Sequence, residues 1–207
     1  MVAIDFHWDL GSTNTYFALH LLKPIAARHG VDIVAHPFNL GYVFRTNSYV
    51  LAEEPRAKLR HRGVDLRRWA KRYELPFRMP DVFPIKTSRA LRGALAMREF
   101  GREWPFIEAI FRAYWELNDA SIADDVGLRR VASELDVDPD RFEALAESEP
   151  IRTQLEAETN AAIERGVFGA PTMFVGNEMF WGKDRMDFLE AELESSLAAT
   201  GADRPLA

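Results

Sequence analysis

Residues 166–185 read GVFGAPTMFVGNEMFWGKDR, and this stretch decides the fold of the chain. Two short apolar runs in it flank a Gly-Asn dipeptide, which is typical of the two-residue turn of a β-hairpin. Pro171 directly precedes the first run, at the start of a strand, where a missing backbone N–H is tolerated. The stretch therefore predicts strands at residues 172–175 and 178–181, followed by a closing helix over residues 184–197.

The N-terminal part of the chain predicts a strand, a helix and a second strand. Large apolar residues alternate over residues 2–8, helical spacing follows over residues 15–29, and a second apolar run covers residues 31–38. Gly30 ends the helix, and Pro24 should bend or break it. Such a βαβ unit has a right-handed crossover.

The middle of the chain carries almost only helical patterns. Helices are predicted over residues 55–73, 87–100, 104–118, 124–135, 139–146 and 150–165. Neither end of the chain suffices alone for a covered sheet. Joined, they predict an α/β fold of order βαβ…ββα, with a mixed four-stranded sheet and a large all-helical insertion. In this organisation residues 1–48 and 166–207 form one domain, and residues 49–165 form the inserted helical domain.

Composition excludes several classes of function. The chain has no cysteine, so it holds no disulfide, cysteine nucleophile or thiolate metal site, and its five histidines show no metal-ligand spacing. The net charge of -6 disfavours a nucleic-acid partner. No apolar run approaches the ~20 residues of a membrane helix, and the first residues do not read as a signal peptide. These features predict a cytoplasmic protein that binds neither nucleic acid nor membrane, and no metal.

Two features at the predicted strand ends have both a structural and a ligand-binding interpretation. Ser12 follows the first strand at the start of a helix, where free N–H groups and the helix dipole stabilise an anion such as a thiolate. It also suits a plain helix cap. Ala170-Pro171 is either an ordinary trans bond or a cis bond that turns the backbone of Ala170 towards a peptide-like ligand.

Three further segments have the same two interpretations. Asp184, after Lys183, caps the last helix or holds the ammonium group of an amino-acid end. The polar residues of the segment after the second strand, Asn39, Arg45 and Asn47, are predicted to lie on a loop beside Ser12, where they bind a ligand or satisfy the loop backbone. The basic residues between 56 and 72 form a solvated helix face or a rim that attracts anionic ligands.

With these motifs in view, the chain resembles the 2-hydroxychromene-2-carboxylate isomerases. These group with kappa-class glutathione transferases in the DsbA-like thioredoxin superfamily. The resemblance covers nearly the whole chain and is strongest over residues 166–172 and 180–185, with support from residues 9–16, 37–44 and 84–95. The sequence departs from the family pattern at Thr13, Asn14, Tyr42 and Thr87-Ser88.

The resemblance implies a thioredoxin-like fold, a homodimer and glutathione as cofactor. Ser12 matches the family serine that holds the glutathione sulfur. The remaining implied contacts come from Ala170, which pairs with the cysteinyl backbone across a cis Pro171, from Lys183 and Asp184, which hold the γ-glutamyl end, and from Asn47, which lies near a family asparagine.

The implied reaction acts on a small aromatic substrate. Glutathione adds to a hydroxychromene carboxylate, the ring opens, a bond rotates, and glutathione leaves to give a trans-o-hydroxybenzylidenepyruvate. Two alternatives stay open: a kappa-like glutathione S-transferase, and a non-catalytic DsbA-like binding protein. A dithiol oxidoreductase is excluded, because it needs a Cys-x-x-Cys pair and the chain has no cysteine.

Overall fold

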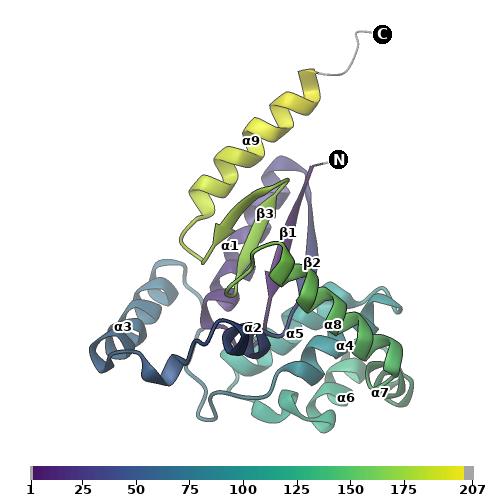
Figure 1. Ribbon diagram of the computed structural model, residues 1–207. Coiled ribbons are helices and arrows are strands. Elements are labelled where there is room, and N and C mark those ends of the chain that lie inside the picture. Colours follow the sequence, from purple (N-terminus) through teal and green to yellow (C-terminus); the bar gives the residue numbers. More distant parts are fainter. Residues whose placement is uncertain (1, 203–207) are drawn as a thin grey trace, which may run out of the picture.

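The computed structural model describes residues 2–202. Figure 1 shows a central sheet, with the long helix α9 rising from it and the inserted helices gathered around its other end. The strands are β1 (Ala3–Trp8), β2 (Asp32–Pro37), β3 (Thr172–Val175) and β4 (Glu178–Trp181). The helices are α1 (Thr13–His29), α2 (Leu40–Thr46), α3 (Arg56–Arg72), α4 (Ser88–Arg98), α5 (Glu103–Trp115), α6 (Asp125–Glu134), α7 (Pro139–Ala146), α8 (Glu149–Glu164) and α9 (Met186–Ala202), with short 3-10 turns at Leu51–Glu53 and Ala120–Ala123.

The sheet is four-stranded and mixed, as predicted. Its strand order is β2-β1-β3-β4, with β1 parallel to β2 and antiparallel to β3. Ile4 in β1 lies opposite both Ile33 in β2 and Val175 in β3, which gives the register of these three strands. Every residue of β3 is buried, whereas β4 forms the edge and is mostly exposed.

Helix α1 starts and ends where its flanking residues predict. The side chain of Ser12 accepts a hydrogen bond from the N–H of Thr15, and Gly30 ends the helix in the left-handed conformation at φ 63°. Pro24 was expected to bend or break the helix, and the break is wrong, because the helix runs through this residue to His29. Leu22 and Ile25, on either side of the proline, are both buried, and this packing outweighs the lost backbone hydrogen bond.

The predicted loop after β2 is in fact the short helix α2. Its first turn is capped by Asn39, whose side chain accepts from the N–H of Tyr42. A helix this short is not stable by propensity alone. Val43 is fully buried in a small apolar cluster with Phe38 and Phe174, so tertiary packing stabilises the turn.

The inserted helices share one continuous core with the sheet. Trp8 of β1 packs against Phe111 of α5 with ring centroids 5.7 Å apart, and both side chains are buried. Buried residues from β1, α1, α4, α5, α6 and α9 belong to the same apolar cluster. The division of the chain into two domains therefore stays a prediction.

Within residues 2–202, no helix is long and apolar enough to cross a membrane.

Candidate functional site

A cavity of about 780 Å³ lies between the start of α1, helices α2 and α3, and the segment that leads into β3. It is lined by parts of the chain that are far apart in sequence and that meet at this end of the sheet. The lining residues are Gly11, Ser12, Thr13, Asn14, Leu40, Phe44, Asn47, Tyr49, Leu51, Glu54, Lys58, Leu59, Arg62, Gly63, Leu66, Met79, Phe83, Phe168, Gly169, Ala170 and Trp181.

Ser12 lies in the wall of this cavity and has two hydrogen-bond partners. Its Oγ accepts from the N–H of Thr15 at 3.2 Å and donates to the carbonyl of Ala170 at 2.7 Å. The side chain is thus a helix cap, which was one of its two interpretations, and it also joins the start of α1 to the turn that precedes β3. The first N–H groups of α1 lack intrahelical partners, so the wall around Ser12 is suited to an anion.

The bond between Ala170 and Pro171 is cis, as the family resemblance implied. The carbonyl of Pro171 accepts from the N–H of Gly182 at 3.0 Å, which ties this turn to the end of β4. Trp181 presses against the same turn: a Cβ atom at position 169 would lie 2.6 Å from the indole Nε1. A side chain at position 169 would therefore require the indole ring of Trp181, which lines the cavity, to move.

Asp9 is a buried carboxylate directly behind the Ser12 loop. Its Oδ1 accepts from the N–H of Gly11 at 2.7 Å, and its Oδ2 accepts from the N–H of Leu40 at 3.0 Å and from the hydroxyl of Thr87 at 3.1 Å. Burial raises the pKa of Asp9, while these three hydrogen bonds oppose that rise. The carboxylate thereby joins the Ser12 loop, α2 and the start of α4. No local motif distinguished Asp9 as part of the site, although its place at the end of a strand was visible.

Replacing Thr87 with valine is expected to lower the free energy of unfolding by about 2 kcal/mol, because a buried carboxylate loses a donor. The Thr87→Ser variant keeps the hydroxyl and serves as the control. Urea denaturation of both variants measures the difference. Equal stability of the two variants would show that the hydroxyl does not hold Asp9.

Lys183 and Asp184 lie outside the cavity lining. The ammonium group of Lys183 lies 4.4 Å from the ring centre of Trp69 and 3.6 Å from a carboxylate oxygen of Asp65, and its side chain is nearly buried. Asp184 is paired with Arg185 at 2.8 Å, two residues before α9 begins. In this structure Lys183 holds α3 against the end of β4, a packing role that the sequence did not reveal.

Of the three polar residues expected beside Ser12, only Asn47 lines the cavity. Its Nδ2 donates to the carbonyl of Val43 at 3.0 Å, which leaves the amide oxygen as an acceptor. Asn39 caps α2, and the guanidinium of Arg45 lies 5.8 Å from the ring centre of Tyr42. These two side chains therefore contact residues of α2 and do not line the cavity.

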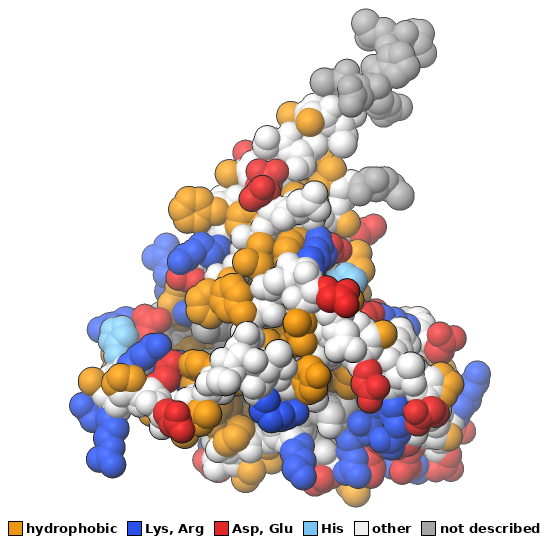
Figure 2. All heavy atoms as spheres, in the orientation of Figure 1, with side chains coloured by type: hydrophobic (Ala, Val, Ile, Leu, Met, Phe, Trp, Pro, Cys, Tyr) orange, Lys and Arg blue, Asp and Glu red, His pale blue; other side chains and the backbone are white. Residues whose placement is uncertain are grey.

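A group of charged side chains lies in the part of the cavity wall formed by α3 and the segment before it. The sequence indicated its basic members but not its carboxylate. Lys58 and Arg62 come from the basic stretch, and both contact Glu54, which also accepts from the hydroxyl of Tyr49. The hydrogen bond from Lys58, followed by that from Tyr49, lowers the pKa of Glu54, so the carboxylate is charged at neutral pH. Figure 2 shows lysine and arginine side chains gathered over α3.

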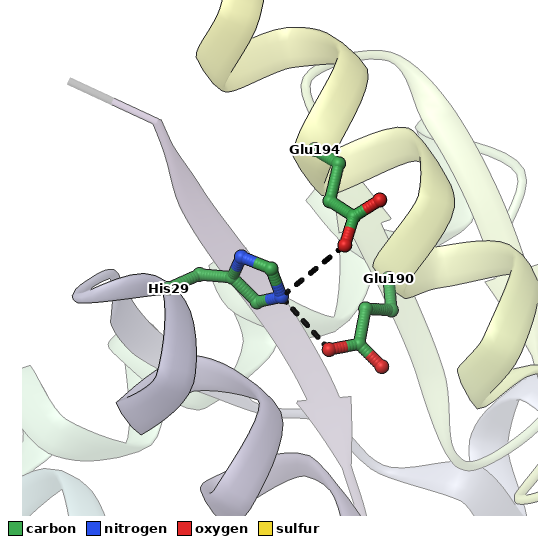
Figure 3. Close-up of side chains that lie close together, drawn as sticks. All are labelled: His29, Glu190 and Glu194. Atoms are coloured by element: carbon green, nitrogen blue, oxygen red, sulfur yellow. Dashed lines mark hydrogen bonds and ion pairs between the residues drawn. The ribbon is translucent and has the colours of Figure 1, made fainter.

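Another cluster lies away from the cavity, between the end of α1 and α9 (Figure 3). His29 Nε2 lies 2.8 Å from a carboxylate oxygen of Glu190 and 3.9 Å from one of Glu194. These three side chains could in principle hold a metal ion. However, Arg28 already binds both carboxylate oxygens of Glu190, at 2.8 and 2.9 Å. The cluster is explained as the ion-pair contact that docks α9 on α1.

Comparison with known proteins agrees with this geometry. The DSBA-like thioredoxin domain family matches residues 3–194. The chain is 34% identical to a 2-hydroxychromene-2-carboxylate isomerase of Pseudomonas sp. (strain C18), over 92% of this chain and 89% of that protein. It is 26% identical to glutathione S-transferase kappa 1 of Caenorhabditis elegans, over 90% of this chain and 88% of that protein.

A solved structure gives the same result. The structure of SeMet 2-hydroxychromene-2-carboxylate isomerase aligns with a TM-score of 0.84 at 31% identity, covering 97% of this chain and 98% of that one. The predicted fold and the family resemblance are thus both confirmed. The chain belongs to the DSBA-like thioredoxin domain family and, within it, to the 2-hydroxychromene-2-carboxylate isomerases.

Proposed function

We propose that the protein is a glutathione-dependent isomerase of the 2-hydroxychromene-2-carboxylate type, which acts on a small aromatic carboxylate. The observation that carries this proposal is the position of Ser12, at the N-terminus of α1 and 2.7 Å from the carbonyl of Ala170, in the wall of a large cavity. Such a place stabilises an anionic sulfur next to a backbone that can pair with a peptide. The isomerase relatives support the substrate class.

The residues present fit a glutathione molecule. The chain has no cysteine. The cavity has a volume of about 780 Å³ and combines polar groups near Ser12 with mostly apolar walls. When bound, glutathione would supply the thiol nucleophile that the protein lacks. The name of the Caenorhabditis elegans relative, a glutathione S-transferase, supports this choice of cofactor.

Ser12 has one hydroxyl proton, and in this structure the carbonyl of Ala170 accepts it. Donation to a sulfur atom therefore requires Ser12 to release this carbonyl. The freed carbonyl can then accept from an amide N–H of the ligand, so no buried acceptor is left without a partner. This exchange gives Ser12 and Ala170 complementary roles: the first holds a proton towards the sulfur, and the second orients the peptide backbone.

The other predicted contacts belong to the same proposal. Pro171 keeps the turn in the cis form, and the free amide oxygen of Asn47 accepts a ligand N–H. Lys183 and Asp184 hold the γ-glutamyl end, for which Lys183 has to leave its place over Trp69. A homodimer in the cytoplasm completes the proposal, the dimer on the family resemblance and the location on the sequence-based expectation.

Isothermal titration with glutathione tests the proposal. We expect saturable binding to the wild-type protein and about tenfold weaker binding to the Asp184→Ala variant, because a charged hydrogen bond to the ligand is lost. The matched control is Asp187→Ala, an exposed carboxylate on the first turn of α9. Absence of binding at millimolar glutathione would overturn the cofactor assignment. Equal binding by both variants would remove Asp184 from the site.

A kappa-like transferase is the second candidate, favoured by the relative that bears this name. The two activities differ in the fate of the thiol. An isomerase returns all glutathione after turnover, whereas a transferase consumes one molecule for each product. Quantifying free thiol after complete conversion of 2-hydroxychromene-2-carboxylate distinguishes them.

A further inference from the structure

Four side chains form a hydrogen-bonded network in the α3 side of the cavity wall. The Tyr49 hydroxyl donates to Oε1 of Glu54 at 2.5 Å, and Lys58 Nζ lies 2.8 Å from the same oxygen. Arg62 Nη2 donates to Oε2 of Glu54 at 2.6 Å. The side chain of Glu54 is only 7% exposed, whereas those of Lys58 and Arg62 are 62% and 34% exposed, so Glu54 is the buried centre of the network.

The network leaves one positive charge in excess. Among the described residues that line the cavity, Lys58 and Arg62 are the cations and Glu54 is the anion. Within the described part of the chain, Arg62 donates to Glu54 through Nη2 alone, so the other edge of the guanidinium keeps donors for a ligand. Glu54 thus orients the guanidinium of Arg62 while occupying only its Nη2 donor.

Apolar side chains line the same cavity as this charged group. Leu51, Leu59 and Leu66 line the wall beside it, and Phe83 and Trp181 line the cavity as well. A single excess positive charge next to an apolar surface is complementary to a molecule with a flat apolar body and one anionic group. A planar carboxylate also matches the guanidinium fork, which binds both oxygens of such a group.

We propose that Arg62, oriented by Glu54 and assisted by Lys58, is a carboxylate-binding clamp that determines specificity for acids over their esters. The proposal rests on the proposed function, because it names a further contact in the same cavity. Two carboxylates can meet the clamp: that of the aromatic substrate and the glycyl carboxylate of glutathione. The test separates the two sources.

The first arm measures equilibrium binding of chromone-2-carboxylate, an unreactive analogue of the substrate, and of its methyl ester. The Arg62→Gln variant is expected to bind the acid at least about tenfold more weakly than the wild type, because a bidentate charged contact is lost. Binding of the ester should change by less than about twofold. Arg60→Gln, an exposed arginine on the same helix that does not line the cavity, is the matched control.

The second arm titrates glutathione and its glycyl monoethyl ester into the same proteins. If Arg62→Gln weakens glutathione about tenfold and leaves the ester unchanged, the clamp takes the glycyl carboxylate. An Arg62→Lys variant, which keeps the charge but loses the fork, should fall between wild type and Arg62→Gln. Circular dichroism of each variant shows whether it is folded before any affinity is compared.

Two results would overturn the clamp: affinities of Arg62→Gln equal to those of Arg60→Gln for both acids, or equal weakening of acids and esters. The proposed function is tested separately. If wild-type protein binds chromone-2-carboxylate but not glutathione, the cofactor assignment fails while the clamp stands. If it binds glutathione and Arg62→Gln changes neither acid, the clamp fails and the cofactor assignment stands.

Discussion

The Ser12→Ala variant is expected to retain its fold and to lose at least about 100-fold in kcat/KM for 2-hydroxychromene-2-carboxylate in the presence of glutathione. Removing a single hydrogen-bond donor to a developing or bound anion in an enclosed site has an effect of this size. Ser12 is 8% exposed and lies in the cavity wall at the start of α1. In the proposed complex, the substitution therefore deprives the sulfur of glutathione of both a hydrogen-bond donor and its orientation. Steady-state kinetics at saturating glutathione measures the loss.

Stability should change much less than activity. The substitution removes the cap of α1 and leaves the carbonyl of Ala170 without its hydroxyl partner. Together these losses lower the free energy of unfolding by about 1–3 kcal/mol, which leaves most molecules of an ordinary domain folded. Urea denaturation monitored by tryptophan fluorescence gives this value.

A second capping residue separates the two effects. Asp138 caps α7, where its side chain accepts from the N–H groups of Asp140 and Arg141, and it does not line the cavity. Asp138→Ala should therefore reduce stability by a similar amount and leave kcat/KM within about twofold of the wild type. If Ser12→Ala behaves like Asp138→Ala, Ser12 is a structural cap and has no part in the reaction.

Acidification from pH 6.5 to pH 4 is expected to remove about 3 kcal/mol of stability through a single side chain, His7. This imidazole is 4% exposed and stacks on His36 with ring centres 4.8 Å apart. Within residues 2–202, neither of its ring nitrogens has a hydrogen-bond partner. Burial, followed by the charges of His36 and Arg165, lowers the pKa of His7 to about 4. Its nearby carboxylates, Asp5 and Glu158, oppose this shift only weakly.

The direction of the effect follows from proton binding. Between pH 6.5 and pH 4 the unfolded chain binds a proton at His7 and the folded chain does not, so acid favours unfolding. The stabilising contribution of neutral His7 is complete above pH 6.5 and is lost progressively down to pH 4. His36 behaves oppositely: burial lowers its pKa, but hydrogen bonds and charges from Glu158 and Asp5 outweigh this and raise it, so its contribution is lost above pH 6.5.

The His7→Phe variant tests this assignment, because phenylalanine keeps an aromatic ring beside Phe38 and Phe174 without a titrating group. Between pH 6.5 and pH 4, the free energy of unfolding of this variant should fall by about 3 kcal/mol less than that of the wild type. NMR titration of the wild-type imidazoles gives an independent value that does not depend on the variant folding. A His7 pKa near 6.5 in the folded protein would contradict the prediction.

Part of the site could be predicted from local sequence alone. Ser12 follows a strand and precedes a helix, and Ala170-Pro171 precedes a strand in a hairpin, so both positions were visible as backbone features. The family resemblance added that they belong to one site. The structure then placed them 2.7 Å apart, Oγ to carbonyl oxygen.

Other parts depended on contacts between distant segments. Helix α2 forms because Val43 is buried against residues from β3 and α8, and no pattern within seven residues can encode that packing. The partners of Lys183 are Trp69 and Asp65, more than a hundred residues earlier in the chain. The preference of Lys183 for these partners over a ligand could not be read from its neighbours.

Local sequence was sufficient to predict the four strands, the helices other than α2 and the place of Ser12, because apolar periodicity, turn residues and caps act over a few residues. The family was indicated by the resemblance of the motif over residues 166–185. Which basic residues of α3 line the cavity, and which side chains hold Asp9, depends on tertiary packing that no local pattern encodes. These choices depend on the direction in which each helix packs, and burial then fixes the charge and partners of every polar group it encloses.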